Sequence, residues 1–116
     1  MKSVSRACLI DALENVWSLQ SSSKWTEANP ALGQCGVTAL VVQDFLGGDI
    51  LKTKYGEIWH FYNLIDDEPV DFTRSQFDNP IEYSNVVSNR EEAFADTNAQ
   101  QYSYLHTAVQ KHLQDA

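Results

Sequence analysis

The sequence predicts an α+β fold in which helices pack on a small antiparallel sheet. Two patterns carry this prediction, because apolar residues recur at helical spacing in three segments and alternate with period two in the middle of the chain. The alternating segments are residues 50–55, 57–64 and 70–73, and turn residues separate them. With 116 residues, the chain has the length of a single domain, residues 1–116, built on one core.

The central element is a predicted buried helix that carries Cys35 in its first turn and is closed by Gly47-Gly48. Its apolar positions have helical spacing: Val37, Leu40, Val41 and Phe45. Pro30 and Gly33 mark a turn before the helix, and Gly47-Gly48 forms a stop signal after it. Cys35 therefore lies in the first helical turn, where free backbone N–H groups and the positive end of the helix dipole favour a thiolate over a thiol.

The same patterns predict the other elements in chain order. The three alternating segments should form an antiparallel meander, because short polar turns join them. Pro80 and a lack of periodicity indicate an irregular segment after the sheet. The remaining expected elements are a helix over 5–18, a loop over 25–32, one helical turn near 75–77, a capped helix over 90–95 and an amphipathic helix over 99–113.

Composition and charge exclude several classes of function. Sixteen acidic and eight basic residues give a formal charge of −8, which opposes binding to the phosphate backbone of nucleic acids. No segment has the roughly 18–20 consecutive apolar residues of a membrane span, and the first residues lack the core of a signal peptide. We therefore expect a cytoplasmic protein that binds neither nucleic acid nor membrane.

The cysteines do not predict a disulfide framework or a metal site. Cys8 and Cys35 are the only two, and no Cys or His pair has the spacing of a zinc site. A single Cys8–Cys35 bridge stays open but is disfavoured in the cytoplasm. Cys8 lies beside the apolar stripe of the first helix and is expected to be a small buried residue. We expect no metal and no cofactor, and the oligomeric state is left open.

Three residues together could carry chemistry: Cys35 at the helix start, His60 in the second strand and Asp71 in the third. A thiol nucleophile needs an imidazole within hydrogen-bond reach to take its proton. That imidazole needs a third group to fix its tautomer and ring plane. Each residue also has a plain structural explanation, as a packed small residue, a core histidine or a turn cap, so the interpretation rests on the combination.

Side-chain alternation tests whether His60 and Asp71 can meet. If the hairpin loop is even and centred between Asp66 and Asp67, residue 65 pairs with 68 and residue 62 with 71. Asp71 then shares a face with His60 as a diagonal neighbour, roughly 7–8 Å away at the backbone, within reach of a hydrogen bond between the side chains. An odd loop would place the two residues on opposite faces.

Four motifs surround these residues: Asn29-Pro30, Gly33-Gln34-Cys35, His60-Phe61-Tyr62-Asn63 and Val70-Asp71-Phe72-Thr73. They resemble the motifs of the YunG family of small, functionally uncharacterised bacterial proteins. More distantly, the order of helix Cys, strand His and strand Asp is similar to the papain-like thiol superfamily in its transglutaminase-like and NlpC/P60-like branches. This similarity implies a papain-like or transglutaminase-like core, with the Cys helix packed on the sheet and helices flanking it at both ends of the chain.

The resemblance also implies roles for single residues. Cys35 would be the nucleophile, His60 the general base and then the general acid, and Asp71 the group that orients His60. The backbone N–H of Cys35 and a side-chain amide would stabilise the oxyanion, with Gln34 and Asn29 as the candidate amides.

Two functions compete at this point. The first is a thiol-dependent acyl-transfer enzyme, a small hydrolase, deamidase or acyltransferase that acts on an amide or ester of a small molecule or peptide through a thioester. The second is a non-catalytic binding or regulatory module on the same scaffold, which holds a ligand or peptide in a groove around Trp25, Trp59 and Tyr62. The enzyme predicts a partly exposed Cys35 in contact with His60, and the binding module predicts a buried or misaligned thiol.

Overall fold

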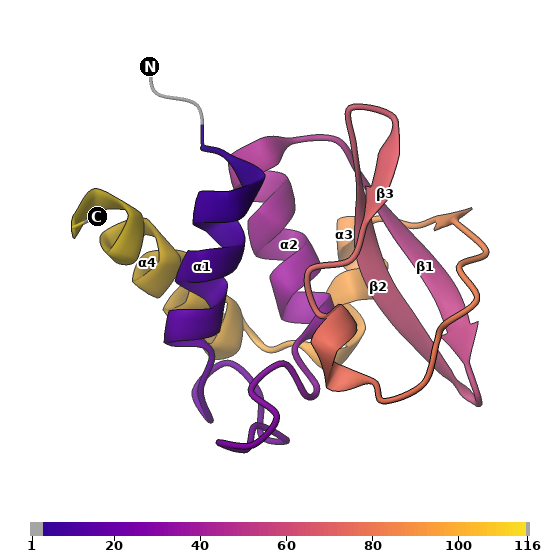
Figure 1. Ribbon diagram of the computed structural model, residues 1–116, viewed down its shortest axis with the longest axis horizontal. Coiled ribbons are helices and arrows are strands. Elements are labelled where there is room, and N and C mark those ends of the chain that lie inside the picture. The colour runs from indigo at the N-terminus through magenta and orange to yellow at the C-terminus, as the bar shows by residue number, and fades with distance from the viewer. Residues whose placement is uncertain (1–3, 116) are drawn as a thin grey trace.

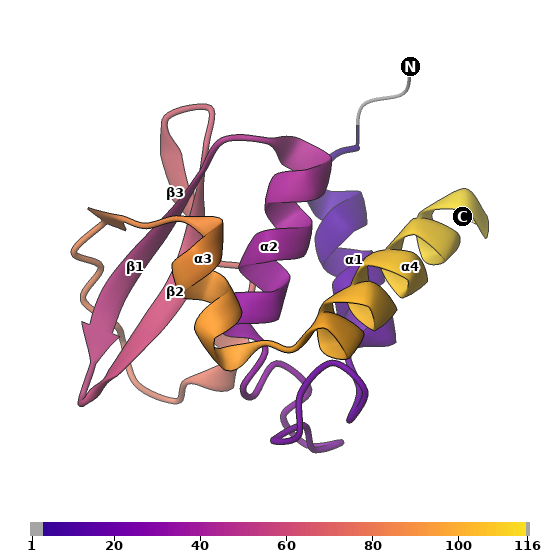
Figure 2. The same cartoon turned by 180° about the vertical axis from the view of Figure 1, so that it is seen from behind.

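A computed structural model describes residues 4–115, which form an α+β arrangement of helices and one antiparallel sheet (Figure 1). Helix α2 lies between the sheet on one side and the pair α1 and α4 on the other, and both views agree on this order (Figures 1 and 2). The elements are α1 (Arg6–Val16), α2 (Cys35–Leu46), β1 (Asp49–Tyr55), β2 (Ile58–Ile65), β3 (Glu68–Val70), the 3₁₀ helix η1 (Arg74–Gln76), β4 (Val86–Val87), α3 (Arg90–Ala93), the 3₁₀ helix η2 (Phe94–Asp96) and α4 (Ala99–Asp115).

The predicted helices are present, and local signals explain their ends. Ser5 caps α1 by accepting a hydrogen bond from the Cys8 backbone N–H. Helix α2 begins at Cys35 and ends at Leu46, and its C-cap residue Gly47 has a φ of +75° and a ψ of −154°, a backbone region that glycine adopts readily and other residues rarely do. Asn89 caps the short helix α3, as the sequence predicts. The described part of the chain contains no helix long and apolar enough to cross a membrane.

The apolar residues of the helices bury themselves in two clusters. The larger cluster joins α1, α2 and α4 through Leu9, Leu13, Val41, Leu105 and Val109. The smaller cluster joins α2 to the sheet through Leu40, Ile50 and Phe61. Burial on both of its sides fixes the position of α2, and with it the position of Cys35.

Cys8 is exposed, so the prediction of a buried Cys8 is wrong. The buried positions of α1 are Leu9, Ala12 and Leu13, a narrow stripe that leaves Cys8 outside it. Both Cys8 and Cys35 are free thiols, and they form no bridge.

The sheet has four strands in the order β3-β2-β1-β4, one more than the predicted meander. Strand β4 pairs with β1 through only two residues, which is too short to leave an alternating pattern in the sequence. The third strand ends at Val70 rather than at residue 73. It ends there because Asp71 accepts a hydrogen bond from the backbone N–H of Thr73, at 3.1 Å, and so turns the chain away from the sheet.

The β2–β3 hairpin confirms the even loop. Ile65 pairs with Glu68 and Asn63 with Val70. The two loop residues, Asp66 and Asp67, have φ values of 52° and 63°, as a type I′ turn requires.

Residues 77–85, called the strap below, cross one face of the sheet after η1. The Thr53 hydroxyl donates to the Glu82 carbonyl at 2.8 Å and accepts from the Ser84 backbone N–H at 2.9 Å. Farther along, the Tyr62 hydroxyl donates to the side chain of Asn85 and accepts from its backbone N–H. The strap thus closes over the sheet face that carries His60 and Tyr62.

Candidate functional site

Cys35 is the first residue of α2, where the sequence predicts it. Gln34 precedes it as N-cap residue but makes no capping hydrogen bond with its side chain. Cys35 is partly exposed and packs at the edge of the smaller core cluster. The next residue, Gly36, lets the chain after α3 approach closely, because a Cβ at this position would lie 2.8 Å from the Ala93 carbonyl oxygen. A free thiol therefore sits at a helix N-terminus that is held in place by packing.

His60 and Asp71 meet as the parity argument predicts. Nε2 of His60 lies 2.7 Å from Oδ2 of Asp71, and both side chains are almost fully buried. The Phe77 ring of the strap stands edge-on to the imidazole, with ring centroids 4.8 Å apart. A short polar contact in an apolar enclosure fixes the ring plane of His60.

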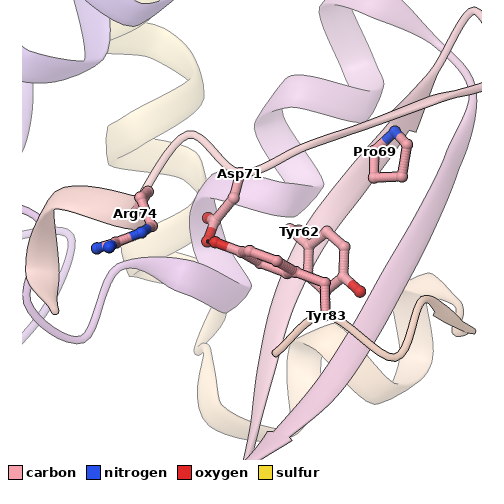
Figure 3. Close-up of a pocket in the computed structure, with 5 residues that line it drawn as sticks. All are labelled: Tyr62, Pro69, Asp71, Arg74 and Tyr83. Atoms are coloured by element: carbon pink, nitrogen blue, oxygen red, sulfur yellow. Dashed lines mark hydrogen bonds between the residues drawn. The ribbon is translucent and has the colours of Figure 1, made fainter. Parts of the chain in front are cut away.

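Four donors hold the Asp71 carboxylate. Oδ2 accepts from His60 and from the Tyr83 hydroxyl, each at 2.7 Å. Oδ1 accepts from the Thr73 backbone N–H at 3.1 Å and from the Thr73 hydroxyl at 3.3 Å. Figure 3 shows the Tyr83 hydroxyl directed at Asp71. Burial, and then the hydrogen bond to Asp71, raise the pKa of Tyr83, so its hydroxyl stays protonated and remains a donor.

The second nitrogen of the His60 imidazole, Nδ1, is buried and has no hydrogen-bond partner among the described residues. The Cys35 thiol lies near the imidazole, since it is one of the groups that raise the pKa of His60. Because Asp71 occupies Nε2, Nδ1 is the ring nitrogen left to interact with the thiol.

The surroundings of His60 favour its charged form. Burial lowers the pKa of His60, but the hydrogen bond to Asp71, the contact with Cys35 and the charges of these two groups outweigh it. The pKa is raised to about 9. At neutral pH the imidazole is therefore an imidazolium, with its Nε2–H on Asp71 and its Nδ1–H without a partner among the described residues.

The two candidate oxyanion amides are engaged elsewhere. Nδ2 of Asn29 donates to the Gln76 carbonyl at 3.1 Å and ties the loop before α2 to η1. Gln34 is fully buried, and its Nε2 lies 3.5 Å from the Ser18 carbonyl, at the limit of a hydrogen bond. Oε1 of Gln34 has no partner among the described residues.

The three aromatic residues predicted to line one groove do not lie together. The Trp59 side chain is on the opposite face of β2 from His60, because adjacent strand residues alternate. The ammonium groups of Lys52 and Lys54 lie over the Trp59 ring, at 4.3 and 4.8 Å from its centroid. Trp25 packs against the larger cluster, and only Tyr62 lies beside His60, with ring centroids 6.0 Å apart.

Tyr83 and Thr73 are the site residues that the sequence analysis does not identify. Thr73 follows Asp71 by two residues, a spacing typical of a local turn, and this signal could have revealed it. Tyr83 lies in a segment without periodicity, and nothing in the sequence places its hydroxyl at Asp71. The described residues contain no group of three or more His, Cys, Asp or Glu side chains that could hold a metal ion.

Comparison with known proteins gives a family but no described activity. The family model described as YunG protein matches residues 5–114. The chain is 56% identical over 101 residues to "Uncharacterized protein YunG" of Bacillus subtilis (strain 168), which covers 87% of this chain and 88% of that protein. No solved structure matches the chain.

Proposed function

The chain belongs to the YunG family, and from the geometry of its site we propose that it is a thiol-dependent acyl-transfer enzyme. It acts on an amide or ester as a small hydrolase, deamidase or acyltransferase, with Cys35, His60 and Asp71 as its triad. Helices precede and follow the Cys helix in the chain, and a small antiparallel sheet packs against it. This arrangement is compatible with a papain-like core, which we include in the proposal. The substrate is a small molecule or a peptide.

One observation carries the proposal: His60 binds Asp71 with one nitrogen and leaves the other, Nδ1, buried and unpartnered among the described residues, while the Cys35 thiol lies near the same ring. An unpaired buried donor is costly, typically about 1–3 kcal/mol. A Cys35 thiolate would satisfy an Nδ1–H of the imidazolium, while the helix N-terminus would stabilise the sulfur charge. Packing alone gives no reason to leave Nδ1 empty at this position.

In the proposed reaction, Sγ of Cys35 attacks the acyl carbon and a C–S bond forms as the carbonyl oxygen becomes an oxyanion. His60 holds the thiol proton on Nδ1 and transfers it to the leaving nitrogen or oxygen as the bond to the acyl carbon breaks. Water, or an acceptor amine or alcohol, then attacks the thioester and gives its proton to Nδ1. The C–S bond breaks, and the sulfur leaves as thiolate or takes the proton back.

Oxyanion stabilisation in this proposal comes first from the backbone N–H of Cys35, which is free as the first residue of α2. Gln34 is the stronger of the two amide candidates, because its donor Nε2 is held only by a long 3.5 Å contact with the Ser18 carbonyl. Asn29 would have to give up its bond to Gln76.

The first test is the pH dependence of Cys35 alkylation by iodoacetamide, in a Cys8→Ser background that removes the exposed second thiol. We expect the rate to stay high well below the free-thiol pKa of about 8.5. It should fall in His60→Ala and remain unchanged in the matched variant His112→Ala, whose imidazole lies on α4 away from the site.

Incubation with p-nitrophenyl acetate extends this test to chemistry. An acyl group on Cys35, identified by mass and removed by hydroxylamine, would support the enzyme. A thiol that follows the ordinary titration, or that reacts only after unfolding, would contradict it and favour the non-catalytic binding module.

A further inference from the structure

A second feature lies next to Asp71. It is a pocket of about 330 Å³, a volume typical of small-ligand sites, lined by Tyr62, Pro69, Asp71, Arg74 and Tyr83 (Figure 3). The proposed acyl transfer makes no use of this space, because neither the nucleophile Cys35 nor the base His60 lines it. From the lining, we propose that this pocket binds a small organic carboxylate.

The donors and acceptors that the lining residues leave unused determine which kind of ligand the pocket can bind. The Tyr62 hydroxyl is already donor and acceptor toward Asn85. The Asp71 carboxylate accepts four hydrogen bonds, from His60, Tyr83 and twice from Thr73, which fills its acceptor positions. Arg74 is the exception on this wall, because a guanidinium carries five N–H donors and makes only one hydrogen bond within residues 4–115, from Nη1 to the Phe77 carbonyl.

Arg74 also lacks an anionic partner within the described residues. The other two arginines, Arg6 and Arg90, each form an ion pair with a carboxylate, and Arg74 forms none, although the chain carries twice as many acidic as basic residues. Its bond to Phe77 holds the side chain at the start of the strap, beside the pocket. A guanidinium held in this way, with unused donors at the edge of a pocket, matches the fork geometry of a carboxylate.

The other walls define the body of the ligand. The Tyr62 and Tyr83 rings meet edge to face with centroids 4.9 Å apart, and the Pro69 ring lies on the strand beside them. These surfaces are flat and largely apolar, so they suit an aryl or short alkyl group attached to the carboxylate. The imidazolium of His60 balances the charge of Asp71, which removes most of the repulsion that a second carboxylate would otherwise meet.

The test is an NMR titration of the ¹⁵N-labelled full chain with phenylacetate, and with phenylacetamide as its neutral counterpart. We expect saturable shifts in the backbone amides around Asp71, Arg74 and Tyr83 with phenylacetate, and a response at least about tenfold weaker with the amide. Arg74→Gln should weaken phenylacetate binding by a similar factor. Lys54→Gln, which removes the same charge from the face opposite His60, should leave binding unchanged.

Arg74→Lys tests whether Arg74 has a purely structural role. This variant keeps the positive charge but loses the paired N–H donors of the guanidinium. Binding by Arg74→Lys between that of the wild type and that of Arg74→Gln would support recognition of a carboxylate. Equal shifts with acid and amide, unsaturable shifts, or unchanged binding by Arg74→Gln would overturn the proposal. This titration does not require a reactive thiol, so the pocket and the acyl-transfer function can fail separately.

Discussion

His60 and Tyr83 share a single oxygen atom: Nε2 of one and the hydroxyl of the other each lie 2.7 Å from Oδ2 of Asp71. The strap that carries Tyr83 is therefore bonded to the same carboxylate that orients the histidine. Two donors that bind one oxygen compete for its negative charge, so the hydrogen bond from each donor weakens the hydrogen bond from the other.

Removing the Tyr83 hydroxyl should strengthen the interaction of Asp71 with His60. We expect Tyr83→Phe to raise the pKa of His60 by a few tenths of a unit, because Oδ2 then has one donor instead of two. NMR titration of the His60 imidazole measures this shift.

Tyr62→Phe is the matched control for Tyr83→Phe. It also removes a tyrosine hydroxyl that binds the strap, but that hydroxyl bonds Asn85 and not Asp71. Equal shifts of the His60 titration in both variants would indicate a loosened strap and would contradict a direct effect through Asp71.

Asp71→Asn should lower the pKa of His60 by about one unit or more, because the variant removes the charge that favours the imidazolium. Neither orientation of the amide fits well, since its NH₂ group must face a donor on one side or the other. We expect the alkylation rate of Cys35 to fall, though by less than in His60→Ala, because orientation is only part of the effect of His60. A His60 titration unchanged by this substitution would contradict the assigned ion pair.

The raised pKa of His60 also predicts how stability depends on pH. The folded state holds this proton up to about pH 9, whereas an unfolded histidine loses it near pH 6.5. The stability that His60 contributes is therefore fully present below pH 6.5 and is lost as the pH rises through about 9. This pKa shift corresponds to a contribution of about a few kcal/mol to the free energy of unfolding.

Urea unfolding of the wild type and of His60→Gln at pH 6 and pH 9.5 isolates this contribution. The decline in unfolding free energy between the two pH values should be larger in the wild type by an amount of that order. Charge repulsion elsewhere in the acidic chain affects both proteins alike. Equal declines in the two proteins would show that His60 has no raised pKa.

The two glycines that end α2 give a matched pair for stability. Both have positive φ values, +75° for Gly47 and +77° for Gly48. A Cβ on Gly47 would meet nothing within 4 Å, while a Cβ on Gly48 would lie 2.0 Å from the Leu64 carbonyl oxygen. We expect Gly47→Ala to cost roughly 1–3 kcal/mol of unfolding free energy, the cost of the backbone conformation alone.

Gly48→Ala should cost several times more, because the chain must move away from β2. Thermal unfolding of the two variants measures the difference. Similar melting temperatures would mean that the turn after α2 adapts to the extra atom.

Local rules predicted one half of the candidate site and could not predict the other. The His60–Asp71 contact follows from strand alternation and from the even turn at Asp66-Asp67, both readable from nearby residues. The contact between Cys35 and His60 depends on where α2 docks against the sheet, and this position is set by packing on both faces of the helix. Helical spacing identifies that helix, but it does not determine at which position along the strands the helix packs.

The features that the sequence analysis did not predict have similar physical causes. Strand β4 is two residues long, too short to show an alternation of apolar and polar residues. Tyr83 reaches Asp71 from a strap whose path is fixed by single bonds to Thr53 and Tyr62 rather than by a repeating pattern. Trp59 does not line the predicted groove with Tyr62. The alternation that places His60 on the sheet face under the strap places the adjacent Trp59 on the opposite face.

The docking of α2 on the sheet also makes the site a reporter of partial unfolding. His60 and Asp71 belong to one hairpin and its exit turn, so they can stay paired while that hairpin is intact. Cys35 belongs to the helical layer and meets His60 only while the two layers are in register. The chemical reactivity of one sulfur atom would thus report separation of the helices from the sheet, even where circular dichroism still records intact secondary structure.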